Sequence, residues 1–120
     1  MPISTLTRQD SQAASLLHQK AFFKGWGKSE FDEFLANPIV YGLKIEDSHE
    51  LSGYILWREA ADEAEILTLV VAPSSQRKGR ATLLLNALFE AASKKNIINL
   101  YLEVAEDNLM AQSFYRNNGF

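Results

Sequence analysis

The apolar positions of residues 1–38 predict a short strand followed by two helices. "PISTLT" (2–7) is typical of a strand, and from Asp10 to about Phe23 apolar residues recur at helical spacing, at Ala13, Leu16, Leu17 and Ala21. Two glycines in "KGWGK" interrupt this pattern. "SEFDEFLAN" (29–37) then predicts a second, short helix with Ser29 as its N-cap, and Pro38 closes it.

Three β-rich runs separated by short polar turns occupy the middle of the chain. They cover residues 39–46, 51–60 and 63–72, and spacers of turn length predict antiparallel neighbours. Residues 79–95 carry the strongest helical pattern, and Asn96 is suited to a left-handed cap after it. The middle of the chain therefore predicts a meander of strands followed by a long helix.

The pattern closes with a strand at 97–104 and a helix at 107–118, which Gly119 ends. The expected order is β-α-α-β-β-β-α-β-α. A strand, helix and strand in succession predict two parallel strands joined by a crossover. The predicted fold class is therefore α/β (α+β), a mixed, mostly antiparallel sheet flanked by helices.

Composition narrows the class of protein. The chain has 120 residues, 47% of them hydrophobic and 22% charged, which fits one globular domain over residues 1–120. Its net charge of −3 excludes a general polyanion binder, so we expect no nucleic-acid partner. The absence of cysteine excludes disulfides and thiolate chemistry. We see no signal peptide and no membrane-spanning run, and we expect a cytoplasmic protein with no membrane partner.

A basic loop stands directly before the strongest helix. Arg77, Lys78 and Arg80 surround Gly79, and Ala81 follows. A helix N-terminus presents unpaired N–H groups and partial positive charge, and glycine allows a ligand to approach the backbone. The spacing is not that of a Walker loop or of a dinucleotide fingerprint. From the loop alone, a phosphate cradle and a solvated basic loop both remain open.

The segment "QRKGRA" resembles the main motif of the Gcn5-related N-acetyltransferases, Gln/Arg-x-x-Gly-x-Gly/Ala after the fourth strand. The resemblance runs from about Glu65 to Phe120, and within the family it is greatest to the ribosomal-protein alanine N-acetyltransferases. It implies acetyl-CoA as co-substrate. We expect no metal, because the two histidines are far apart and lack partner motifs. The resemblance also implies that the cofactor is bound at the loop, by Gln76, Arg77, Lys78, Gly79, Arg80, Ala81 and Thr82.

Glu103 is the candidate general base. It lies between Leu102 and Val104, where a carboxylate would be costly to bury without a partner. An exposed glutamate on an alternating strand is the structural alternative. The family's "LxLEV" pattern implies the catalytic role, acting on the amine through water.

Tyr115 is the candidate acid for the departing thiolate, because its ordinary pKa of about 10 lies above that of a thiol. Asn108, Ala111 and Tyr115 lie at i, i+3 and i+7, so they share one face of the last helix. The alternatives are an aromatic residue at the margin of the core and an asparagine at the helix start. The resemblance implies that Asn108 contacts the cofactor.

The strand before the loop and the N-terminal helices complete the predicted site. The family implies that the backbone of Leu69, Val70 and Val71 contacts acetyl-CoA, with one amide facing the developing oxyanion. Trp26 is either a lip of the acceptor groove or a plug between two helices. His18 and His49 lack partner motifs and are interpreted as surface or hydrogen-bonded structural histidines.

The leading hypothesis is transfer of acetyl from acetyl-CoA to a protein N-terminus, namely the N-terminal alanine of a small-subunit ribosomal protein. The alternatives are another amine, such as a lysine or a small metabolite, or a non-catalytic protein that binds CoA. Relative to the family we expect the chain to lack the final strands. Such a chain would be a monomer, or a dimer through an unpaired sheet edge.

Overall fold

The computed structural model describes residues 3–76, 79–102 and 109–119. The strands are β1 (Ile3–Thr5), β2 (Val40–Asp47), β3 (Glu50–Ala60), β4 (Glu63–Val71) and β5 (Asn99–Leu102). The helices are α1 (Ser11–Ala21), α2 (Lys28–Ala36), α3 (Arg80–Lys94) and α4 (Leu109–Asn117), with short 3-10 turns η1 (Arg8–Asp10) and η2 (Pro73–Ser75). The predicted order of strands and helices is confirmed.

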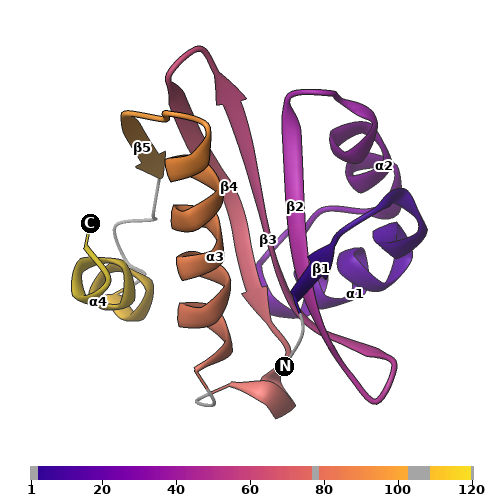
Figure 1. Ribbon diagram of the computed structural model, residues 1–120. Helices are drawn as coiled ribbons and strands as arrows, with labels where there is room; N and C mark the ends of the chain where they lie inside the picture. The colour runs from indigo at the N-terminus through magenta and orange to yellow at the C-terminus, as the bar shows by residue number, and fades with distance from the viewer. Residues whose placement is uncertain (1–2, 77–78, 103–108, 120) are drawn as a thin grey trace.

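The five strands form one sheet in the order β1-β2-β3-β4-β5. Neighbouring strands are antiparallel except β4 and β5, which pair in parallel and are joined in sequence by α3. Helices α1 and α2 cover one face of the sheet, and α3 and α4 lie on the other (Figure 1). The mixed, mostly antiparallel sheet flanked by helices is thus the fold that the sequence predicted.

Each face of the sheet has its own apolar core. Under α3, the buried residues are Ile45, Ile55, Trp57, Ala64, Ile66, Leu84, Leu85 and Leu88. Under α1 and α2, they are Leu6, Ala14, Phe31, Val40, Tyr54, Leu56 and Val70. Because strands β2, β3 and β4 supply residues to both cores, the alternation of side chains along them sets which helix layer each residue meets.

Strand β4 changes this alternation at Leu67. In the register with β3, Trp57 pairs with Ile66 and Leu56 pairs with Thr68, so Leu67 is an inserted residue. Ile66 packs in the α3 core, whereas Leu67 and Val70 pack in the core under α1 and α2. Thr68 also faces the α1 layer, because its hydroxyl contacts His18 on α1. The bulge therefore turns two successive side chains toward the same helices.

The helix ends follow local chemistry, with one correction. Helix α2 begins after Gly27, whose N–H donates to the Glu30 carboxylate at 3.1 Å. The prediction of Ser29 as N-cap was wrong, because this bond starts the helix earlier and leaves Ser29 in its first turn. Asn96 has φ of 59° after α3, as predicted for a left-handed cap. Among the described helices, none has the length and apolarity needed to cross a membrane.

Candidate active site

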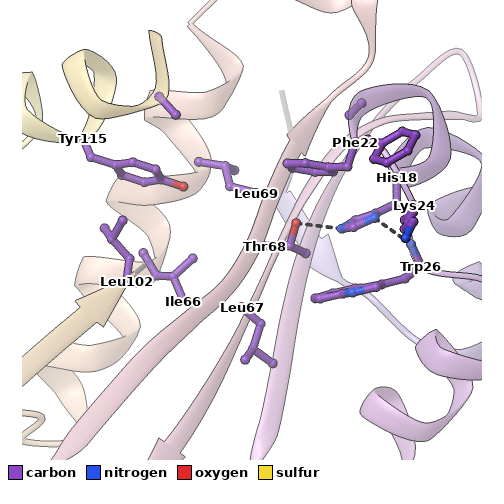
Figure 2. Close-up of a pocket in the computed structure, with 13 residues that line it drawn as sticks. His18, Phe22, Lys24, Trp26, Ile66, Leu67, Thr68, Leu69, Leu102 and Tyr115 are labelled. Atoms are coloured by element: carbon purple, nitrogen blue, oxygen red, sulfur yellow. Dashed lines mark hydrogen bonds between the residues drawn. The ribbon is translucent and has the colours of Figure 1, made fainter. Parts of the chain in front are cut away.

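A cavity of about 520 Å³ opens between the two helix layers beside β4 (Figure 2). Its lining comes from α1 and the loop after it, from β4 and β5, and from α4. The residues are His18, Ala21, Phe22, Phe23, Lys24, Trp26, Ile66, Leu67, Thr68, Leu69, Leu102, Ala111 and Tyr115. The lining is largely apolar, with a few polar groups at its centre, which is typical of a small-ligand or peptide-end site.

A second cavity, of about 230 Å³, lies at the N-terminus of α3. Gly79 has φ of 76°, and a Cβ built on it would have no described atom within 4 Å. The first α-helical bond is from the Leu83 N–H to the Gly79 carbonyl, at 3.0 Å. The N–H groups of Arg80, Ala81 and Thr82 precede it, and Gly79 can offer no side-chain cap. This geometry fits a pyrophosphate, which needs several convergent N–H donors and open space over the backbone.

The side chain of Arg80 has a structural partner. Its guanidinium is ion-paired with Asp47 at the end of β2, with Nη2 2.7 Å from Oδ2, and only 7% of the residue is exposed. Arg80 therefore reaches the cradle through its backbone N–H, while its side chain links α3 to the β2–β3 hairpin. Its place in the basic loop suggested that Arg80 would add positive charge to an anion site. Because Asp47 neutralises the guanidinium, the contribution of this charge is smaller.

The edge of β4 that faces away from β3 runs between the two cavities. The Ala72 N–H donates to Ser52 across β3 at 2.7 Å, and antiparallel pairs alternate in hydrogen bonding. The backbone groups of Leu69 and Val71 therefore point away from β3, on the side where β5 pairs with β4 over Glu63–Ile66. Val71 lines the smaller cavity and Leu69 the larger one. An extended ligand arm can follow this edge from one cavity to the other.

Helix α4 lies against the same two cavities. Phe114 lines the smaller one, and its neighbour Tyr115 lines the larger one together with Ala111. Burial raises the pKa of Tyr115 to about 12. The phenol is therefore protonated throughout the physiological pH range and acts as a hydrogen-bond donor rather than as a phenolate.

Several predicted site residues can be located and others cannot. Gln76 donates from Nε2 to the Val71 carbonyl at 3.2 Å, so it braces the strand that leads into the cradle. Leu102, the residue before Glu103 in sequence, lines the larger cavity. The predicted positions Arg77, Lys78, Glu103 and Asn108 lie outside the described residues.

Sequence reasoning missed the polar centre of the larger cavity. His18 is 5% exposed, accepts the Trp26 N–H at Nδ1 (2.9 Å) and contacts the Thr68 hydroxyl through Nε2 (3.2 Å). The interpretation of His18 as a hydrogen-bonded histidine holds, but its place in the cavity was not foreseen. Trp26 packs against Phe31 and Phe34, as a plug between helices would, and also lines the cavity.

The N-terminus of α3 and the edge of β4 fit an extended, phosphate-containing ligand. The model of the acetyltransferase (GNAT) family matches residues 12–120, and the chain belongs to this family. It is an acetyl-CoA-dependent N-acetyltransferase.

Relatives with assigned names cover nearly the whole chain. It is 32% identical over 124 residues to the N-alpha-acetyltransferase RimI of Mycobacterium tuberculosis, covering 98% of this chain and 77% of that protein. It is 29% identical over 118 residues to the [ribosomal protein bS18]-alanine N-acetyltransferase of Haemophilus ducreyi, covering 98% and 81%. The crystal structure of the ribosomal-protein-S18-alanine N-acetyltransferase from Escherichia coli superposes with a TM-score of 0.91 at 25% identity, over 98% of this chain and 76% of that one.

Proposed function

We propose that this enzyme acetylates the N-terminal amine of a protein, and that the acceptor is the N-terminal alanine of the small-subunit ribosomal protein bS18. The observation that carries the proposal is that relatives named for this reaction align with 98% of the chain. That alignment includes both cavities and the helices beside them, rather than the cofactor loop alone. We also propose that residues 1–120 act as one domain, since both apolar cores share one sheet.

The N-terminus of α3 would hold the pyrophosphate of acetyl-CoA. The N–H groups of Gly79, Arg80, Ala81 and Thr82 supply the donors, and Gln76 braces the strand before them. Arg77 and Lys78 add positive charge, and Asn108 adds a polar contact. The edge of β4 would pair with the pantetheine arm, and its alternation favours Leu69 and Val71 over Val70 for the direct backbone bonds.

The acetyl transfer would then be direct. Glu103 accepts a proton from the amine through water, the amine nitrogen bonds to the thioester carbon, and the carbon–sulfur bond breaks. A backbone N–H of Leu69 or Val71 stabilises the oxyanion while it exists. Tyr115 donates a hydrogen bond to the departing sulfur, and its high pKa favours this over complete proton transfer.

The described lining of the larger cavity is mostly aromatic and aliphatic. Among its described residues there is no carboxylate, and Lys24 contributes a cation. A neutral amine beside a small apolar side chain, as at an N-terminal alanine, suits the aromatic and aliphatic lining.

Mass spectrometry of acetylated peptides tests the assignment. The enzyme is incubated with acetyl-CoA and a peptide bearing the N-terminal sequence of bS18, beside a peptide whose only free amine is a lysine side chain. We expect acetylation of the first peptide at its α-amine. Acetylation of the lysine peptide alone would assign a lysine side chain as the acceptor in place of the N-terminal alanine. CoA binding without turnover of any amine would favour the non-catalytic alternative. Full turnover by Glu103→Gln would remove Glu103 from the mechanism.

A further inference from the structure

The hydrogen bonds of His18 fix which ring nitrogen carries the proton. A backbone N–H can only donate, so Nδ1 of His18 must accept the bond from Trp26. The neutral ring then has its proton on Nε2, and the Thr68 hydroxyl is the acceptor of that N–H. Both bonds are visible in Figure 2, where the imidazole lies between the loop and β4.

The loop held by His18 forms one wall of the larger cavity. The Trp26 indole stacks on the imidazole with centroids 4.3 Å apart and planes 10° from parallel. Gly25 packs so closely on the end of α1 that an added Cβ would lie 2.5 Å from the His18 carbonyl oxygen. Phe22 and Lys24, in the same loop, also line the cavity. The position of this wall therefore depends on the imidazole that it covers.

Thr68 meets His18 because of the bulge in β4. With uninterrupted alternation, Thr68 would face the same side as Ile66, toward α3. The inserted Leu67 turns it toward α1, where it lines the cavity and is 7% exposed. Among the described residues, the Thr68 hydroxyl is hydrogen-bonded to His18 alone. A hydroxyl that accepts one bond still has a proton to donate and a second lone pair.

We propose that His18 and Thr68 together recognise the acceptor amine. His18 is a positioning residue, which holds the loop at residues 22–27 against β4 and fixes the direction of the Thr68 hydroxyl. Thr68 is the contact residue, and it bonds the first residue of the acceptor with its remaining lone pair or proton. The proposal rests on acetyl transfer to an amine, and it holds whichever amine the enzyme uses.

The environment of His18 supports a ring that is neutral at physiological pH. Burial lowers the pKa of His18 from 6.5 to about 4, although the nearby Glu30 carboxylate acts in the opposite direction. A protonated ring would turn an N–H toward the Trp26 N–H and break that bond. Because its one unprotonated nitrogen, Nδ1, already accepts the Trp26 N–H, His18 has no free lone pair for a general base, and its role is to orient neighbouring groups.

Steady-state kinetics test the proposal with two variants, each of which removes the hydrogen bond between His18 and Thr68 from one side. His18→Asn keeps an oxygen near the position of Nδ1 for the Trp26 N–H but cannot reach Thr68, and Thr68→Val removes the hydroxyl at constant shape. We expect each to raise the KM for the amine about tenfold, the effect of losing one oriented hydrogen bond, while kcat and the KM for acetyl-CoA change less than about threefold. The double variant should be no worse than either single one.

Matched controls separate positioning from mere folding. Thr68→Ser retains the hydroxyl and should restore most of the amine KM. Thr5→Val, on the exposed strand β1, and His49→Asn, in the β2–β3 turn, make the same kinds of change away from the cavity. An unchanged amine KM in Thr68→Val would overturn the proposal. The proposal would also be overturned if the variants raised the KM for the amine and for acetyl-CoA equally, in proportion to their loss of melting temperature.

Two further measurements keep the outcome independent of the acceptor. The amine for the kinetics is the one that wild type acetylates fastest from a panel containing the bS18 peptide, a glycine-initiated peptide, a serine-initiated peptide and a lysine peptide. If the bS18 peptide is not used, the proposed function fails while the His18–Thr68 pair is still tested. ¹⁵N NMR of the His18 ring should show Nε2 protonated and Nδ1 unprotonated at pH 7, and the reverse assignment would overturn the proposal.

Discussion

The guanidinium of Arg80 lies against the carboxylate of Asp47, with Nη2 2.7 Å and Nε 3.0 Å from Oδ2. This contact joins the first residue of α3 to the last residue of β2. It holds the Arg80 side chain away from a ligand at the loop, although its place in the sequence suggested a cation there. The pair also carries a stability consequence, because the arginine is buried while the aspartate is 35% exposed.

Asp47→Asn should destabilise the protein by about 1–2 kcal/mol, since it leaves a buried guanidinium without its counter-charge. The value is below that for a fully buried pair because water screens the aspartate. Urea denaturation measures the change. Glu90→Gln, which removes the exposed Lys94–Glu90 pair, is the matched control and should change the free energy of unfolding by less than about 0.5 kcal/mol. Equal effects in the two variants would contradict this account of Arg80.

Gly79→Val should weaken acetyl-CoA binding by more than tenfold, more than Arg77→Ala or Lys78→Ala alone. Valine strains a backbone at φ of 76° and fills the space over the helix N-terminus. Isothermal titration calorimetry with acetyl-CoA measures the affinity. Gly79→Asn is the informative comparison, because asparagine tolerates the left-handed conformation and separates loss of space from loss of backbone geometry. If Gly79→Asn binds acetyl-CoA like wild type, strain rather than space is the cause.

Gly25→Ala should damage the acceptor side alone. An added Cβ would lie 2.5 Å from the His18 carbonyl oxygen, so the loop must move away from α1. We expect a rise of about tenfold in the KM for the amine, of the size that loss of one oriented hydrogen bond produces, with acetyl-CoA affinity kept. Gly27→Ala is the control in the same loop, since its Cβ would meet only the Glu30 carboxylate, at 3.9 Å. A normal amine KM in Gly25→Ala would show that the loop position does not matter.

Protein stability should fall as pH is lowered from about 6.5 to about 4, the interval between the ordinary pKa of histidine and that of His18. In this window the unfolded chain binds a proton that the folded chain excludes, so stability is lost at up to about 1.4 kcal/mol per pH unit. Among the described residues, Glu30 on α2 and Lys24 in the cavity lining are charged groups near this ring.

Urea denaturation at pH 7, 6 and 5 measures this dependence. His18→Asn should flatten the slope, although carboxylates still titrate at the lowest pH. His49→Asn replaces the other histidine, at a left-handed turn position that asparagine accepts, and should keep the wild-type slope. Parallel curves for wild type and His18→Asn would contradict the neutral, buried ring.

Tyr115→Phe should lower kcat about tenfold or more while the KM for acetyl-CoA stays within about threefold, because the phenol acts on the departing sulfur. The pKa of about 12 places its ionisation beyond the working range, so wild-type kcat should show no loss from Tyr115 between pH 8 and pH 10. Rapid-quench or thiol-release assays across this range give both results. An alkaline fall in wild type that Tyr115→Phe abolishes would contradict the raised pKa.

The fold could be predicted because its signals are local. Helical spacing, polar turns and the glycine before α3 each act within a few residues, and Asn96 ends α3 in the left-handed conformation expected of it. The start of α2 was misplaced because the Glu30 carboxylate bonds the backbone N–H of Gly27, three residues before it. The helix therefore begins before Ser29, the residue that the sequence pattern favoured as its cap. The cofactor loop was found through motif spacing, but the partner of Arg80 lies 33 residues away and leaves no local trace.

The polar centre of the larger cavity could not be predicted for a related reason. His18 and Thr68 are 50 residues apart, and their contact requires the extra residue in β4. Period-two alternation places Thr68 on the opposite face, so a strand pattern read from sequence gives the wrong neighbour. A histidine on an amphipathic helix gives no sign of which strand it will meet.

The bulge in β4 has an evolutionary consequence. Beyond it, side chains at Thr68 and Val70 face α1 and α2, whereas Leu69 packs against the α3 core and, with Val71, turns its backbone groups away from β3, toward the proposed donor site. In the proposed reaction, one strand serves both substrates, the acceptor through side chains and the donor through backbone groups. Residues on the acceptor side can drift toward new amines while the donor is still held by main-chain atoms, which substitution leaves in place.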